Sequence, residues 1–123
     1  MNRKNPFLTR REVEVMLILW NLPSKGGFTS DIRAGYPEGE TPAYTTLATF
    51  LKILVTKGYV KVRKAGSQLY YTPKISKEEY SKRYMKKLCG DFFDGKPEMF
   101  IKFLLKENPL SEEQKQVVLN ALG

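Results

Sequence analysis

The chain has 123 residues, a length that fits one domain or one domain with a small appendage. It contains no histidine and a single cysteine, Cys89. These counts remove the commonest general base and exclude a tetrahedral Cys/His zinc site within one chain. The sequence has no nucleotide-binding loop, no paired carboxylates and no nucleophile with a base. We therefore expect neither an enzyme nor a protein that holds a metal or cofactor.

The net charge of +8 is concentrated in the first part of the chain. Residues 1–74 hold 12 Lys/Arg against 5 Asp/Glu, whereas residues 75–123 hold 9 against 8. Such asymmetry favours a polyanion partner for the N-terminal part. Every apolar run is far shorter than the ~20 residues that span a bilayer. The N-terminus lacks the pattern of a signal peptide, and a lone cysteine suits a reducing compartment, so we expect a cytoplasmic protein.

Capping signals predict two helices near the N-terminus. Thr9 and Glu12 form a capping box, and apolar residues at helical spacing extend the first helix over about 10–21. A brief second helix is expected over Asp31–Ala34, capped by Thr29 or Ser30. A loop rich in glycine and proline follows.

A third helix is expected to begin at Thr41, as N-cap, with Pro42 in the first helical position. It runs to Lys57, and Gly58 is well placed as the glycine that ends it. Two alternating runs, 59–63 and 68–72, flank a turn with a glycine and predict a β-hairpin. The order of three helices and a hairpin predicts a winged helix-turn-helix domain over residues 1–74, in a fold that is mainly α-helical.

The third helix is the candidate DNA reader, because the second helix of a helix-turn-helix pair enters the major groove. It has no acidic residue from Thr41 to Lys57, and its outer face carries small hydroxyls, one aromatic ring and a lysine. The expected base-reading residues are Tyr44, Thr45, Thr46, Ala48, Thr49 and Lys52. The expected phosphate contacts are Arg10, Arg11, Lys57, Lys61, Arg63, Lys64, Ser67 and Gln68.

Residues 75–123 predict a helical dimerisation domain. Helices are expected from Ser76 to about Phe93, over Pro97–Glu107 and from Ser111 onwards. Three short helices cannot enclose so many large side chains alone, which favours burial against a second chain over packing on the chain's own N-terminal domain. The expected interface residues are Tyr80, Tyr84, Leu88, Phe92, Phe93, Phe100, Phe103, Val117, Val118 and Leu122.

The residues therefore favour a homodimeric DNA-binding regulator. The alternative is a winged-helix protein-interaction adaptor that uses the same fold without specific DNA binding. The basic hairpin and the absence of acidic residues from the third helix favour DNA.

The sequence resembles the penicillinase and methicillin-resistance repressors, a family that includes copper-responsive members. The similarity covers almost the whole chain, and its combined spacing is more specific than any one piece. The matching residues are Leu8-Thr9, Glu12, Val15-Met16, Leu19-Trp20, Thr46, Thr49, Leu51, Leu54, Lys57-Gly58-Tyr59-Val60, Gly66, Tyr71, Thr72-Pro73 and Leu110-Ser111-Glu112-Glu113.

The resemblance implies a dimeric winged-helix repressor on a palindromic operator upstream of resistance genes, often including its own. It implies double-stranded operator DNA as a partner, the C-terminal helices as a dimer clasp, and no small-molecule substrate. It also implies a membrane-bound, antibiotic-sensing metalloprotease that leads to cleavage within the clasp and so releases the operator.

Three features depart from this family pattern. Ile53 stands where many relatives have an arginine in the recognition helix, so one family contact is lost. The aligned cleavage pair is Phe103-Leu104 in place of Asn-Phe, so either proteolytic release is absent or the protease has a different specificity. The cysteine-rich tail of the copper-responsive branch is absent, which argues against copper sensing.

Overall fold

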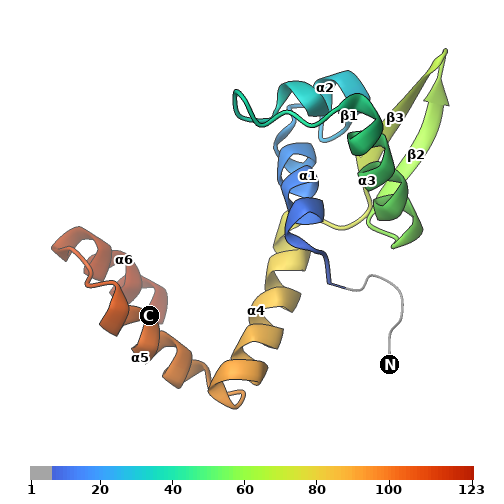
Figure 1. Ribbon diagram of the computed structural model, residues 1–123. Coiled ribbons are helices and arrows are strands. Elements are labelled where there is room, and N and C mark those ends of the chain that lie inside the picture. The colour runs from blue at the N-terminus through green and yellow to red at the C-terminus, as the bar shows by residue number, and fades with distance from the viewer. Residues whose placement is uncertain (1–6) are drawn as a thin grey trace. The chain divides into compact units, whose positions relative to one another are not determined.

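The computed structural model describes residues 7–123, which divide into an N-terminal unit that ends at Ser81 and a C-terminal unit over Lys82–Gly123 (Figure 1). In chain order the elements are α1 (Arg10–Asn21), β1 (Gly27–Phe28), α2 (Thr29–Ala34), α3 (Tyr44–Thr56), β2 (Val60–Ala65), β3 (Gln68–Pro73), α4 (Lys77–Phe93), α5 (Pro97–Glu107) and α6 (Glu112–Leu122). The predicted fold class, mainly α-helical with a winged helix-turn-helix, is confirmed. In the part of the chain that the structure describes, every helix is too short or too polar to cross a membrane.

Reciprocal hydrogen bonds fix the start of α1. The Thr9 N–H donates to Oε1 of Glu12 at 3.0 Å, and the Glu12 N–H donates to Oγ1 of Thr9 at 3.3 Å. This is the predicted capping box, which satisfies two backbone donors that the helix itself leaves unpaired. From this start, Val15, Met16 and Leu19 fall on one face of α1 and are fully buried.

The start of α3 differs from the prediction. Its N-cap is Ala43, so Thr41 and Pro42 lie before the helix, and no side chain caps it. Nε and Nη2 of Arg33, near the end of α2, both donate to the Pro42 carbonyl, at 3.3 and 3.2 Å. Ala43 is extended, with φ −59° and ψ 151°, so the helix cannot include Pro42. The proline therefore lies before the helix, where its carbonyl accepts from Arg33, and not in its first turn.

The predicted end of α3 is confirmed, whereas the predicted start of α2 is wrong. Gly58 has a φ of +85° and ends α3 as expected; its N–H donates to Val55 O, and the Tyr59 N–H donates to Leu54 O. The second helix begins earlier than expected, at Thr29, with Oδ2 of Asp31 accepting from the Phe28 N–H at 2.9 Å. The cap is therefore the acidic side chain of the first turn and not a hydroxyl.

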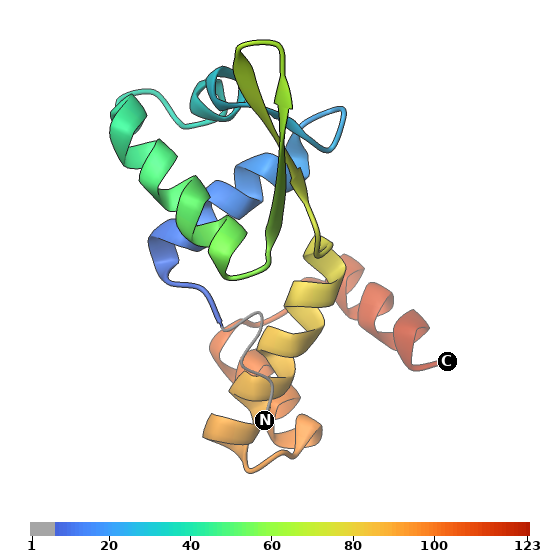
Figure 2. The ribbon, with the colours of Figure 1, turned by 90° about the vertical axis from the view of Figure 1, so that its right-hand side faces the viewer.

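The β-strands form an antiparallel sheet in the order β1-β3-β2, in which the predicted hairpin is β2–β3. Gly66 makes its turn with a φ of +69°. The additional strand, β1, pairs Gly27 with Tyr71 and Phe28 with Tyr70. It is only two residues long, which is too short to show the alternation that identifies a strand in a sequence. Figure 2 shows the hairpin extending from the helices, with α3 beside it.

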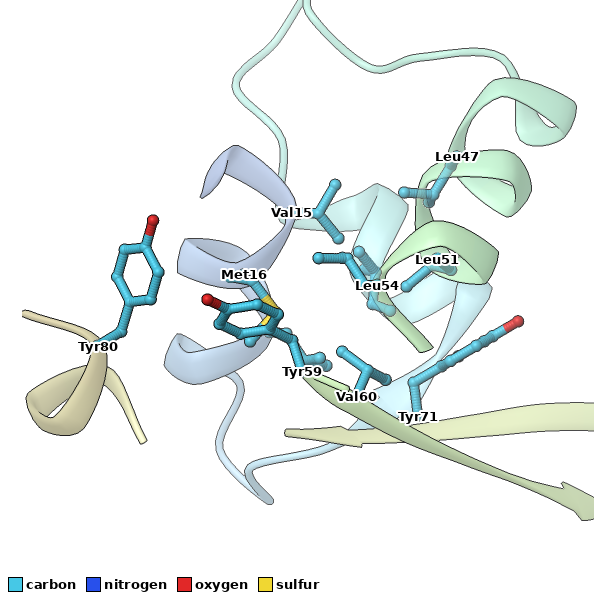
Figure 3. Packing of buried hydrophobic residues seen from close by; sticks show 11 residues of the cluster. Val15, Met16, Leu47, Leu51, Leu54, Tyr59, Val60, Tyr71 and Tyr80 are labelled. Carbon is cyan, nitrogen blue, oxygen red and sulfur yellow. The ribbon is translucent and has the colours of Figure 1, made fainter. Parts of the chain in front are cut away.

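The hydrophobic core of the N-terminal unit lies between α1, α2, α3 and the sheet (Figure 3). Tyr80, in the first turn of α4, belongs to this core. It is only 6% exposed, packs its ring against Tyr59 and Trp20, and accepts a hydrogen bond at Oη from the Leu8 N–H at 3.1 Å. The buried apolar residues of this core are Val15, Met16, Leu19, Ile32, Leu47, Leu51, Leu54, Tyr59, Val60, Tyr71 and Tyr80.

Tyr80 was predicted at the dimer interface, and the structure corrects this expectation. A spacing of four residues places Tyr80 on the apolar face of a helix, but it does not identify the surface that covers this face. The sequence predicts a domain boundary after residue 74. In the structure the N-terminal unit ends later, at Ser81. A further tie within the N-terminal unit is the hydrogen bond from Nε1 of Trp20 to Ile75 O, at 2.8 Å.

The C-terminal unit consists of short helices with an exposed apolar surface. The Ser111 hydroxyl and Gln114 form the capping box at the start of α6, and Pro97 opens α5. Phe93 stacks on Phe100 with ring centroids 5.1 Å apart and lies 5.6 Å from Phe103. No side chain over residues 82–123 is buried. This unit therefore leaves its large apolar side chains in contact with solvent.

Candidate nucleic-acid interface

The outer face of α3 is polar, exposed and free of negative charge. Tyr44, in the first turn, is 58% exposed, and Lys52 is exposed two turns later. Ala48 is half-buried, while the hydroxyl-bearing residues around it, Thr45, Thr46 and Thr49, are exposed. Of the six predicted base-reading residues, five are exposed on α3 and Ala48 is half-buried among them.

The hydroxyl of Thr49 has a defined orientation on this face. It donates to Thr45 O, one turn earlier, at 3.0 Å. A hydroxyl has one donor hydrogen and two acceptor lone pairs, so Thr49 is left with an acceptor and a methyl group to present outwards. Such a side chain suits the amino group of adenine or cytosine, or the methyl group of thymine.

The hairpin contributes positive charge beside α3. Lys61, Arg63 and Lys64 are exposed on β2, as are Ser67 and Gln68 at the turn. In both ribbon views α3 lies next to the hairpin, and its first turn lies toward the same end of the unit as the hairpin tip (Figures 1 and 2). From Thr41 to Lys77 the chain has seven Lys/Arg and no Asp/Glu. Neither element carries an acidic side chain. Their exposed residues are here called the α3–hairpin surface: Tyr44, Thr45, Thr46, Thr49 and Lys52 on α3, and Lys61, Arg63, Lys64, Ser67 and Gln68 on the hairpin.

Lys57, a predicted phosphate contact, forms an ion pair at the end of α3. Its Nζ lies 2.7 Å from Oε1 of Glu12, at the start of α1. Only 7% of the Glu12 side chain and 25% of the Lys57 side chain are exposed. Burial raises the pKa of the Glu12 carboxyl, but the bonds from Lys57 and Thr9 outweigh it and hold the pKa below its usual value. Lys57 therefore neutralises a buried carboxylate, and a contact of its ammonium with a phosphate stays a prediction.

The two arginines of α1 that are expected to contact phosphate lie close to an acidic side chain. Arg10 and Arg11 are exposed and lie 3.9 and 3.6 Å from the carboxylate of Glu14. The start of α1 lies away from the hairpin tip in both ribbon views (Figures 1 and 2). A role for these two arginines in DNA binding stays a prediction.

The sequence patterns do not identify two residues near this surface. Arg33 ties the end of α2 to Pro42, just before α3, and Tyr70 lies on β3 with the guanidinium carbon of Arg63 4.7 Å from its ring centroid. Neither is distinctive in the sequence, because one is a basic residue in a short helix and the other an aromatic residue in an alternating strand. The strand register, which places Arg63 opposite Tyr70, is the signal that could have found the second pair.

The predicted interface residues of the C-terminal unit lie mostly on accessible surface. Phe92 is 73% exposed, Val117 is 67% exposed and Leu122 is 76% exposed. Tyr84, Phe103 and Val118 are also exposed, whereas the rest, Leu88, Phe93 and Phe100, are half-buried. The candidate cleavage pair, Phe103 and Leu104, lies inside α5 with both side chains about half exposed.

Comparison with known proteins gives consistent matches. The model of the penicillinase repressor family matches residues 8–122. A penicillinase repressor from Bacillus licheniformis is 26% identical over 112 residues, which are 91% of this chain and 86% of that protein.

Two solved structures are similar in both fold and sequence. The solution structure of the DNA-binding domain of the repressor BlaI has a TM-score of 0.54 and 28% identity, covering 64% of this chain and 94% of that one. The solution structure of monomeric Bacillus licheniformis BlaI in complex with the blaP half-operator has a TM-score of 0.51 and 30% identity, covering 63% and 92%. The chain belongs to the penicillinase repressor family, a family of transcriptional repressors and not of enzymes.

Proposed function

We propose that the chain is a sequence-specific DNA-binding repressor that acts as a homodimer on a palindromic operator, with α3 in the major groove and the hairpin along the phosphate backbone. Its main support is the α3–hairpin surface, which has exposed hydroxyls on α3, the cations Lys61, Arg63 and Lys64 on β2, and no acidic residue in either element. The similar BlaI chain bound to a half-operator supports the same role.

The C-terminal unit supports the homodimer. Without a buried side chain over residues 82–123, this unit gains little by folding alone, and its exposed phenylalanines and valines need a partner. A second copy of the same unit offers a matching apolar surface. Two-fold symmetry in the protein would then correspond to two half-sites in the operator.

Release by proteolysis is the remaining part of the proposal, with genes of the β-lactam-resistance type as the regulated targets. A cut between Phe103 and Leu104 would separate α6 from the rest of the clasp. A membrane-bound sensor metalloprotease is the proposed source of this cut. Since a dimer holds both half-sites at a high effective concentration, the loss of the clasp weakens binding without any change to α3.

The DNA-binding role is tested by selecting duplexes from a random-sequence pool with the full chain. Fluorescence anisotropy then compares a selected duplex with a random duplex of equal length, at 50 and 200 mM salt. We expect much tighter binding to the selected duplex and a steep loss of affinity as salt rises, since phosphate contacts release counterions. Absent or salt-insensitive binding would instead identify a protein-interaction adaptor.

The release mechanism is tested on the same selected duplex. A β-lactam or a metal salt added to the intact protein should leave the affinity unchanged, whereas a chain truncated after Phe103 should bind far more weakly. Release of the intact protein by a β-lactam or a metal ion alone would contradict the mechanism.

A further inference from the structure

Arg63 on β2 faces Tyr70 on β3. The two residues are cross-strand partners in the hairpin, and the guanidinium carbon lies 4.7 Å from the centroid of the tyrosine ring. A cation over an aromatic face at this distance is attracted by the negative potential of the ring. Arg63 itself is exposed, while Tyr70 is half-buried. The exposed arginine side chain thus stacks on a ring that is itself partly buried.

Tyr70 is held in place by the segment around β1. Its ring meets that of Phe28 edge to face, with centroids 5.0 Å apart. Its hydroxyl lies 3.4 Å from the hydroxyl of Ser24, which donates to Gly26 O at 2.8 Å. A Cβ at Gly26 would lie 3.0 Å from both Cε2 and Oη of Tyr70, so a glycine here allows the ring its close approach.

The guanidinium of Arg63 remains available for an anion. No acidic side chain lies within ion-pair distance of it in residues 7–123, and the surrounding stretch from Thr41 to Lys77 contains none. A stacked guanidinium keeps N–H donors at its edge, and its charge persists at all physiological pH values. Holding a long side chain in one place before binding reduces the entropy that is lost when it contacts a ligand.

We propose that Tyr70 is a positioning residue for DNA binding, which holds the Arg63 guanidinium on the hairpin ready to contact a backbone phosphate. This inference rests on the proposed function, since it assigns Arg63 to a phosphate. Tyr70 acts only through Arg63 and makes no DNA contact of its own.

The test is a double-mutant cycle on the full chain, measured by anisotropy with the selected duplex over a series of salt concentrations. Tyr70→Leu should weaken binding about two- to fivefold, the size expected of an exposed cation–π contact, and leave the salt slope unchanged because the charge remains. In an Arg63→Ala background, Tyr70→Leu should have no further effect. In a Lys64→Ala background, the matched control in the same hairpin, it should retain its full effect. Tyr70→Phe keeps the ring and should rescue the binding that Tyr70→Leu loses.

Each contrary outcome has a distinct meaning. An equal loss from Tyr70→Leu with and without Arg63 would overturn the inference, because the tyrosine would then act through the fold of the hairpin. Unchanged or tighter binding would also overturn it, since the stacking would then not prepare Arg63 for DNA. If Arg63→Ala itself changed neither affinity nor salt slope, the proposed phosphate contact would fail instead. Should Tyr70→Leu fail to fold, Arg63→Lys gives a second measure: it keeps the charge and should still weaken binding, because an ammonium lacks the flat stacking face.

Discussion

At the scale of single residues, the ion pair between Glu12 and Lys57 joins the start of α1 to the end of α3. The 2.7 Å contact is largely sheltered from water, and Glu12 also accepts from the Thr9 N–H to complete the cap of α1. Removing one partner of such a pair leaves a buried charge without compensation. The pair is therefore expected to contribute to folding and not to DNA contact.

Replacing Lys57 with methionine tests this assignment. We expect a loss of about 3–5 kcal/mol in the free energy of unfolding, because the Glu12 carboxylate stays buried without its cation. Urea unfolding at pH 7 measures the change, and Lys61→Ala, on the exposed face of β2, serves as a control that should stay within about 0.5 kcal/mol of wild type. A stable Lys57→Met protein with a reduced salt slope for DNA would mean that the lysine binds phosphate.

The same carboxylate makes stability depend on pH. Burial raises the pKa of Glu12, but Lys57 and Thr9 outweigh it, so the folded-state pKa lies below the unfolded value near 4.5. A carboxyl with a lowered pKa stabilises the fold fully above its unfolded pKa, and this stabilisation is lost as the pH falls through the folded value. The stability advantage of wild type over Glu12→Gln should therefore be largest at neutral pH and shrink below about pH 4.5. Urea unfolding between pH 7 and 3 would reveal a constant difference if this reasoning were wrong.

At the scale of elements, the sequence predicted best those features that local signals determine. The capping boxes at Thr9 and Ser111 and the glycine at 58 correctly located helix ends, because their hydrogen bonds lie within a few residues. Contacts between different segments of the chain could not be predicted from these local signals. Arg33 donates to Pro42 just before α3, and Glu12 pairs with Lys57, 45 residues further along the chain. The order of charged residues in the sequence does not show which cation will pair with a buried carboxylate.

The hairpin and α3 are expected to do different work on DNA. Lys61→Ala should weaken binding to selected and random duplexes alike and reduce the salt slope by about one, as expected of a phosphate contact. Thr49→Ala or Lys52→Ala should instead reduce the preference for particular base pairs, where each good contact is worth ~1–3 kcal/mol of discrimination. Anisotropy with single-base variants of the selected duplex separates the two effects. Equal effects of every change on all duplexes would remove α3 from the role of reader.

At the scale of the whole molecule, the two units differ in how they bury apolar surface. The N-terminal unit has a core of its own, which extends to Tyr80, while every side chain over 82–123 stays at least partly exposed. The sequence correctly indicated an excess of large apolar side chains in the C-terminal part. It could not assign Tyr80 to the core, because periodicity along a helix does not identify the surface that covers it.

A charge on the apolar face of the C-terminal unit should prevent dimerisation. Glutamate at both Phe92 and Phe100 would bring unpaired carboxylates into the proposed interface, at a cost that a short helical clasp cannot offset. Sedimentation velocity at micromolar concentration should show a dimer for wild type and for the Lys61→Ala control, and a monomer for this double variant. A monomeric wild type would contradict the clasp.

The most direct test of a dimer with two reading helices compares two duplexes by titration with the full chain. One duplex carries the complete selected palindrome, and in the other a single half-site is scrambled. We predict two chains on the complete duplex and an affinity at least about 10² higher than for the scrambled one, since the second half-site binds within an already formed complex. One chain per duplex, with equal affinity for both, would contradict the account.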